Sequence, residues 1–220
     1  MTVSSIGDPT HGSLSEAVYA AVHHRIVTGA YRPNQRLVET EIAAELGASR
    51  TPVREAIVRL IKDGLAVRSR HGLMVREFTF PEVREIYEVR AAIEGYAARL
   101  AAERRTPEAI AAIAEHLSHH ARSSQGEAVD RARVVETNAD FHDAVLAAAG
   151  NDRMQSLATS NLSYFFNIEA AAVTSDDALV VALDEHQLIY DAIRESDGDK
   201  AEAIVRGHIM AGLKVIESFL

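Results

Sequence analysis

The stretch LGASRTPVREAIVRL, residues 46–60, marks the junction between two short helices. Gly47 is placed to end the first helix, because glycine readily adopts the left-handed backbone conformation that follows a helix. Thr51 and Pro52 are placed to start the second, since a hydroxyl can cap free amides and proline suits the first helical position. Only about three residues, ASR, lie between the two helices. The stretch therefore predicts a helix pair joined by a tight turn.

The second helix of this pair has one apolar face and one basic end. Val53, Ile57 and Leu60 recur at helical spacing and form a face that can pack against other elements. Arg50 and Arg54 lie four residues apart, so they project together from the N-terminal end. This arrangement is typical of a helix-turn-helix whose second helix enters the major groove of DNA. The alternative is a small helical domain whose arginines are simply solvated.

The segments on both sides of the helix pair extend this pattern. Before it, apolar residues at helical spacing predict a helix over residues 14–29. After it, LAVRSRHGLMVREF, residues 65–78, alternates around RHG and predicts two strands with a basic tip, which would form a wing. Residues 50–76 also carry seven Lys or Arg against two acidic residues. That concentration favours contacts with phosphates.

The composition of the whole chain sets further bounds. The net charge of −9 argues against a nucleic-acid partner, but residues 1–80 hold 10 Lys or Arg against 8 acidic residues, and residues 81–220 hold 13 against 24. The basic part is therefore N-terminal. The absence of cysteine excludes disulfides and thiolate metal ligands. Because the chain has neither a leader pattern nor an apolar run of about 20 residues, we expect a cytoplasmic protein with no membrane partner.

The N-terminal part resembles a known family of DNA-binding proteins. RPNQRLVETEIAAELGASRTPVREAIVRLIKDGLAVRSRHGLMV, residues 32–75, is similar to the winged helix-turn-helix domain of GntR-family bacterial transcription regulators. The resemblance implies that Arg50, Thr51 and Arg54 contact DNA from the recognition helix. It implies that the wing-tip residues His71 and Gly72 lie near the minor groove. The chain departs from the family in its turn, where Asn34 replaces the usual glycine.

From Pro81 onward the sequence is rich in alanine and almost continuously helical. Breaks rich in Gly, Ser, Pro and Asp divide it into six predicted helices, at about 81–104, 107–122, 127–149, 152–172, 176–196 and 198–219. Successive helices with short connections favour a six-helix antiparallel bundle. The predicted fold is thus mainly α, with a flexible tail over residues 1–13, a winged helix-turn-helix domain over 14–78 and a helical effector- and metal-binding domain over 79–220.

Polar residues interrupt the apolar stripes of three of these helices. In NADFH, residues 138–142, Asn138 and His142 lie on or beside the stripe, whereas Asp140 is about 200° from His142 around the helix and faces away. His186 and His208 interrupt the stripes of the last two helices. A single such histidine would be interpreted as a hydrogen-bonded core residue. Three of them, one with an amide a turn earlier, favour a divalent transition metal such as zinc or nickel.

The C-terminal half resembles the all-helical effector-binding region called FCD, found in the FadR-type branch of GntR regulators. NADFHDAVLAAAGN, DEHQLIYDAIRESDGDKAEAIVRGH and VREIYEVRAAIEGYAARLAAER match its characteristic segments. In metal-binding members, an acidic or amide residue and three histidines are the ligands. The resemblance therefore implies a ligand set of Asn138, His142, His186 and His208. Many members have Asp where this chain has Asn138, which removes one negative charge from the site.

Arg90 lies on the inward stripe of the first bundle helix, where a guanidinium needs an acidic partner. Glu94, one turn later, could be a purely structural partner. The functional interpretation is that Arg90 binds a carboxylate effector whose other oxygens reach the metal, since arginine offers a bidentate fork. The family resemblance favours the functional interpretation of Arg90.

Together these features predict a ligand-responsive transcription regulator, which we expect to be a repressor that binds double-stranded operator DNA as a homodimer and is released by a small carboxylate effector. One alternative is a metal-dependent hydrolytic enzyme, which lacks an evident base because Glu185 points about 100° away from His186. The other is a pure metal-sensing regulator whose DNA affinity follows metal concentration alone.

Overall fold

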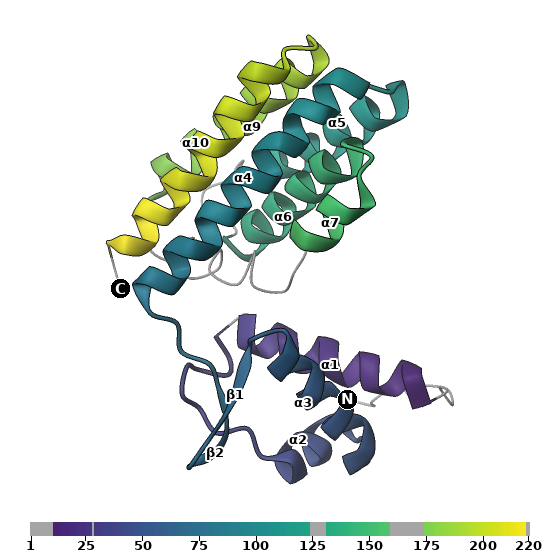
Figure 1. The fold of residues 1–220 in the computed structure, drawn as a ribbon, viewed down its shortest axis with the longest axis vertical. Coiled ribbons are helices and arrows are strands. Elements are labelled where there is room, and N and C mark those ends of the chain that lie inside the picture. Colours follow the sequence, from purple (N-terminus) through teal and green to yellow (C-terminus); the bar gives the residue numbers. More distant parts are fainter. Residues whose placement is uncertain (1–10, 28, 124–130, 159–173, 219–220) are drawn as a thin grey trace. The chain divides into compact units, whose positions relative to one another are not determined.

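The computed structural model describes residues 11–27, 29–123, 131–158 and 174–218, and the chain divides into two compact units, Met1–Glu77 and Phe78–Leu220 (Figure 1). Each unit has its own core. None of the described helices combines the length and apolar composition that a membrane crossing requires.

The first unit is a winged helix-turn-helix, as predicted. Its elements are α1 (His11–Val27), α2 (Glu39–Leu46), α3 (Arg50–Lys62), β1 (Ala66–Ser69) and β2 (Gly72–Val75). The predicted apolar face of α3 is buried against α1, and β1 and β2 pair antiparallel in a hairpin. The helical spacing in α3 and the alternation over residues 65–78 thus correctly predicted the helix pair and the wing.

Two local predictions in this unit were wrong in detail. The helix expected over 14–29 is α1 and begins at His11, so part of the predicted tail is helical, while residues 1–10 lie outside the described residues. The third helix begins at Arg50 with Ser49 at its N-cap, which makes no side-chain cap bond, so Thr51 is already inside the first turn. Gly47 ends α2 in the left-handed conformation, as expected, with φ 62°. Asn34 has the same φ, a conformation that asparagine tolerates better than most residues.

The second unit is an all-helical bundle. It contains α4 (Phe80–Arg104), α5 (Pro107–Ser123), α6 (Arg131–Ala148), α7 (Asp152–Ala158), α9 (Asp176–Arg194) and α10 (Gly198–Glu217). Each of the six predicted helices has a counterpart among the described residues, although the end of the helix expected over 152–172 lies outside them. Thr79 and Glu82 form a capping box at the start of α4, and the Asp197 side chain caps α10.

The directions of the bundle helices determine which residues can meet. α4 and α10 lie side by side along much of their length (Figure 1) and run antiparallel, because Arg84 pairs with Glu217 whereas Arg99 pairs with Asp199. α4 and α6 run in the same direction, since Arg104 near the end of α4 donates to the carbonyl of Gly150, just past the end of α6, at 2.8 Å. The middle turns of these helices therefore share one level of the bundle.

Candidate metal centre and DNA interface

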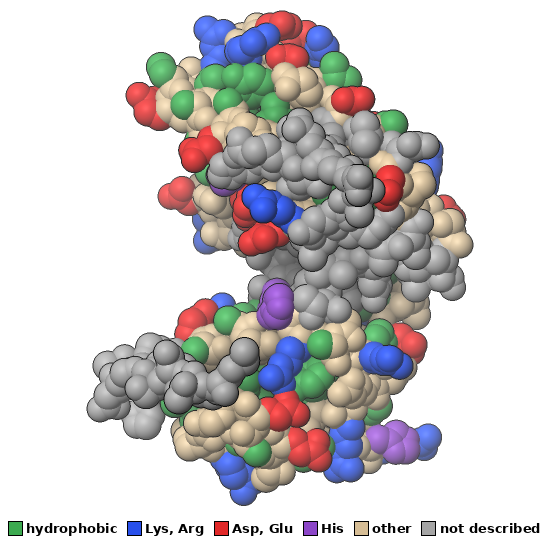
Figure 2. Space-filling model, turned by 180° about the vertical axis from the view of Figure 1, so that it is seen from behind, with side chains coloured by type: hydrophobic (Ala, Val, Ile, Leu, Met, Phe, Trp, Pro, Cys, Tyr) green, Lys and Arg blue, Asp and Glu red, His purple; other side chains and the backbone are tan. Residues whose placement is uncertain are grey.

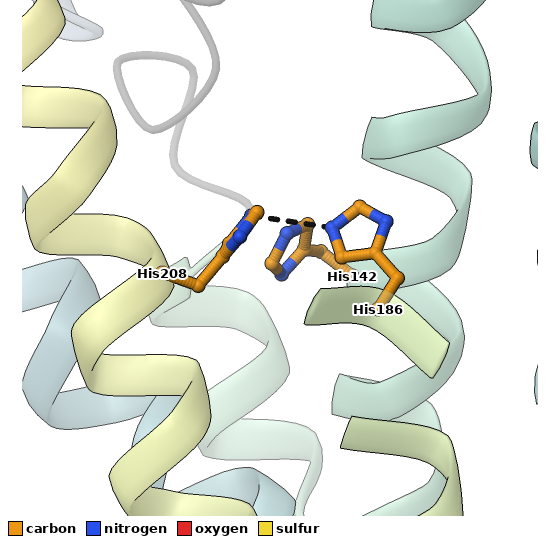
Figure 3. A group of neighbouring side chains, drawn as sticks. All are labelled: His142, His186 and His208. Atoms are coloured by element: carbon orange, nitrogen blue, oxygen red, sulfur yellow. Dashed lines mark hydrogen bonds between the residues drawn. The ribbon is translucent and has the colours of Figure 1, made fainter. Parts of the chain in front are cut away.

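Three helices of the second unit each bring a histidine to the same point. His142 comes from α6, His186 from α9 and His208 from α10, and one ring nitrogen from each lies within 4.8 Å of the others. Figure 3 shows the three rings facing one another across the bundle. His142 and His186 are 3% and 0% exposed, and the His208 side chain is 12% exposed. The structure thus brings together the three histidines of the predicted ligand set.

His142 is oriented by a buried carboxylate. Its Nδ1 atom lies 3.0 Å from Oε2 of Glu94, and the other oxygen of Glu94 accepts a 3.0 Å hydrogen bond from Nε of Arg90. Burial opposes ionisation of Glu94, but Arg90 and His142 outweigh that effect and lower the pKa of the carboxyl to about 2. Burial also disfavours the charged form of His142, and for a histidine this lowers the pKa. A neutral His142 with Nδ1 turned to Glu94 keeps Nε2 available for a ligand bond.

His208 also has a carboxylate partner, Glu185. The Nδ1 atom of His208 lies 2.7 Å from Oε2 of Glu185, and this bond lowers the pKa of Glu185. Glu185 was expected to point away from His186 and so to lie apart from the site, but its carboxylate contacts His208. Its direction, about 100° from His186 on the same helix, is what turns it toward α10 and His208. The sequence signal for this contact was an acidic residue, Glu185, directly beside the predicted ligand His186.

His186 completes the cluster from the most buried position. Its Nε2 atom lies 3.2 Å from Nε2 of His208, the contact drawn as a dashed line in Figure 3. Phe141 stacks on the ring, with centroids 4.3 Å apart and planes 20° apart. This packing fixes the plane of the imidazole and directs its Nε2 toward the other two histidines.

The donor set fits a divalent transition metal. Neutral imidazole nitrogens are ligands for zinc and nickel, and two of the three histidines have a carboxylate at Nδ1, as metal-bound histidines commonly do. The buried Nε2 of His142 has no hydrogen-bond partner among the described residues, an arrangement that a metal ion would satisfy. Asn138 lines the same cavity as His142 and His208, whereas Asp140 is exposed on the other side of α6. The three histidines could therefore hold one ion.

Arg90 also lines this cavity. Its side chain is 5% exposed, its Nε is bonded to Glu94 and its guanidinium lies 5.0 Å from the centroid of the Tyr87 ring. The structural partner considered from the sequence, Glu94, is thus present, and it is shared with His142. Arg90 and His142 are thus two contacts of a single carboxylate.

The first unit presents a basic surface at the start of α3. Arg50, Thr51 and Arg54 are all exposed there. Both arginines face Glu39 of α2: Nε of Arg54 is 2.8 Å from Oε2 of Glu39, and Nη2 of Arg50 is 3.6 Å from the same oxygen. These contacts lower the pKa of Glu39. Glu39 was not among the residues predicted for this surface, although the sequence places an acidic residue at the start of the preceding helix.

The second basic feature of this unit is the wing. His71 is exposed at the turn between β1 and β2, and the neighbouring Arg68 and Arg70 are exposed as well. Figure 2 shows basic side chains and a histidine gathered at this tip. Gly72 has φ 106°, a conformation that favours glycine, and an added Cβ would lie 3.3 Å from Nε of Arg36. The tight hairpin thus depends on Gly72.

Comparisons with known proteins match both units. Residues 14–75 match the model of bacterial regulatory proteins of the gntR family, and residues 85–211 match the model of the FCD domain. A probable D-xylose utilization operon transcriptional repressor of Paenarthrobacter nicotinovorans is 34% identical over 176 residues, which cover 80% of this chain and 76% of that protein. The Nta operon transcriptional regulator of Aminobacter aminovorans is 27% identical over 180 residues, which cover 81% and 83%. The solved structure of McbR/YncC from Escherichia coli has the same fold, with a TM-score of 0.80 and 21% identity over 94% of this chain and 99% of that one.

Proposed function

Because this chain belongs to the GntR family of bacterial regulatory proteins and carries an FCD domain, we propose that it is a repressor released from operator DNA by a small carboxylate held at a metal site. The chain is a transcription regulator and not an enzyme, in keeping with its relatives. That conclusion comes from the comparisons. The lack of a catalytic base near the histidines is not an argument against an enzyme, because the carboxylate of Glu185 contacts His208.

The proposed DNA contacts come from the exposed basic groups of the first unit. Arg50, Thr51 and Arg54 occupy the first turns of α3, where side chains of a recognition helix reach base edges and phosphates in the major groove. The wing tip at His71 and Gly72 contacts the backbone or the minor groove beside it. Two copies in a homodimer place two recognition helices on an inverted repeat in cytoplasmic DNA.

The proposed metal site uses Asn138, His142, His186 and His208. Three neutral nitrogens and one amide oxygen suit zinc or nickel, both of which accept mixed nitrogen and oxygen ligands. When bound, the ion supplies a Lewis-acidic position for an anionic oxygen. Glu94 and Glu185 hold His142 and His208 in the orientation that directs their Nε2 atoms to the ion.

The observation that carries the effector proposal is the presence of a buried arginine in the cavity of the histidine cluster. Arg90, His142 and His208 line one space of about 320 Å³, the size of a small-molecule site. A carboxylate there has a guanidinium on one side and the metal position on the other. Effector binding then acts on DNA affinity to the extent that the DNA-competent arrangement of the dimer binds the effector more weakly.

The test follows DNA affinity while metal and carboxylates are added separately. Full-length protein is stripped with a chelator, and its affinity for a duplex selected from a random library is measured by fluorescence anisotropy, first with zinc and then with zinc plus each of a set of carboxylates. We expect at least one carboxylate to weaken binding by about tenfold or more in the presence of zinc. A full response to zinc alone, with no further effect of any carboxylate, would identify a pure metal sensor instead.

A further inference from the structure

The cavity beside the histidine cluster is polar at one end and apolar at the other. Its polar end consists of the side chains Arg90, Asn138, His142, Glu185 and His208. The rest of its described lining is predominantly aliphatic, with Tyr87 and Thr174 beside Val134, Val135, Leu179, Val181, Ala182, Ile209, Ala211, Gly212 and Val215. A ligand that fills this space must therefore present a charged head to one end and carbon to the other.

The apolar residues extend in one direction from the histidines. Val134 precedes His142 by eight residues on α6, which is about 12 Å along the helix axis, and Val215 follows His208 by seven residues on α10, which is about 10 Å. Because α6 runs parallel to α4 and α10 runs antiparallel to it, these two displacements point the same way. The apolar part of the cavity is thus about two helical turns long.

The charges around the polar end set the charge of the ligand. A divalent ion on the three neutral histidines and the guanidinium of Arg90 provide three positive charges, and the carboxylates of Glu94 and Glu185 provide two negative ones. Asn138 is neutral. One positive charge remains among the described groups, and a single carboxylate balances it, whereas a di- or tricarboxylate would leave unpaired negative charge in a buried site.

We propose that the effector is a monocarboxylate with an apolar tail of about eight carbons, such as a medium-chain fatty acid, rather than a hydroxy acid or sugar acid. This inference rests on the proposed carboxylate response. The length follows from the cavity, because a carbon–carbon bond of about 1.5 Å advances a zigzag chain by about 1.3 Å, so about eight carbons span about 10 Å. Most hydroxyls of a sugar acid would face aliphatic side chains such as Val134, Leu179 and Val215, which cannot form hydrogen bonds.

The experiment measures binding of defined acids to zinc-loaded, full-length protein by calorimetry. Butanoate, hexanoate and octanoate form a series of increasing tail length. Gluconate has a carboxylate but no apolar tail, and octanol has the tail but no carboxylate. We expect affinity to rise about fourfold per added methylene up to octanoate, and gluconate and octanol to bind at least tenfold more weakly than octanoate. Equal affinity for gluconate and octanoate would overturn the apolar tail but leave the carboxylate proposal standing. Absence of binding by every acid would overturn both.

A cavity-filling variant locates the tail. Ala182→Phe should weaken octanoate binding by about tenfold or more while zinc content and butanoate binding are kept, because the added ring occupies the apolar end. Ala203→Phe, at an exposed position of α10 outside the lining, is the matched control. Should Ala182→Phe fail to fold, Val215→Thr adds a hydroxyl at nearly the same volume and should weaken octanoate severalfold. Unchanged octanoate affinity in a folded variant of either kind overturns the proposal.

Discussion

The Nδ1 atom of His142 lies 3.0 Å from a carboxylate oxygen of Glu94, and both side chains are almost completely buried, at 3% and 2% exposure. The second oxygen of Glu94 is bonded to Arg90. One carboxylate therefore orients a proposed metal ligand and holds the arginine proposed to bind the effector. Any change at Glu94 acts on both groups, because its carboxylate contacts each of them directly.

Glu94→Gln should weaken zinc binding by about 10- to 100-fold, since the amide cannot serve Arg90 and His142 as the carboxylate does. The same change should lower the free energy of unfolding of the metal-free protein by about 3 kcal/mol, because it removes the charge of the carboxylate from the buried Arg90–Glu94 pair. Competition with a chelating dye and urea unfolding measure the two effects. Glu185→Gln is the comparison: its side chain is 33% exposed, so zinc affinity should fall with a stability loss below about 1 kcal/mol. Unchanged zinc affinity in Glu94→Gln would refute the orienting role.

The His186→Ala/His208→Ala protein should lose its metal. Elemental analysis of purified wild-type protein should find a transition metal near one per chain, and the double variant should contain almost none, because two of the three nitrogen ligands are gone. His116→Ala, on α5, is a control that should keep full metal content. Asn138→Ala separates the ligand sets: a weaker affinity indicates that the amide oxygen coordinates. A double variant that retains the wild-type metal content would eliminate the proposed site.

Arg50→Ala should abolish specific operator binding while the fold and the dimer stay intact. Arg50 is exposed at the first position of α3, so its removal costs few packing contacts but removes a base or phosphate contact. Anisotropy titrations with operator duplex measure the affinity, and circular dichroism and sedimentation check fold and assembly. Lys62→Ala, at the other end of the same helix, should bind nearly as well as the wild type. Wild-type affinity in Arg50→Ala would contradict the DNA-binding assignment.

Glu39→Gln should raise affinity for non-specific DNA and reduce the ratio of specific to non-specific binding. In the free protein Glu39 offers one oxygen to both Arg50 and Arg54, which offsets part of their charge and fixes their positions. Without that carboxylate the arginines meet any phosphate more readily, so binding to a scrambled duplex should strengthen severalfold and depend more steeply on salt. Titrations of operator and scrambled duplexes at several salt concentrations test this. Glu41→Gln, an exposed acid of the same helix, controls for net charge, and an equal effect there would exclude a specific role for Glu39.

The residue pattern alone predicted the fold and the members of the histidine cluster. The helical spacing of apolar residues predicted which faces of the helices pack, and Gly47 predicted the end of α2. The same periodicity placed His142, His186 and His208 on inward stripes, because the direction of a side chain from its own helix axis depends only on local geometry. The start of α3 was predicted less well, since Ser49, Thr51 and Pro52 all suit the first turn and tertiary packing selects among such alternatives.

The partners of those residues were decided by the tertiary structure. Periodicity gives the angle of Glu185 around α9, but only the position of α10 makes that angle lead to His208. It places Glu94 one turn after Arg90, but only the parallel course of α4 and α6 brings His142 to the other oxygen. A helix of known phase can contact many neighbours, and the contacts that orient a ligand depend on which neighbour packs there and at what level. The sequence by itself determined which groups point inward, and the packing of the helices determined which of them meet.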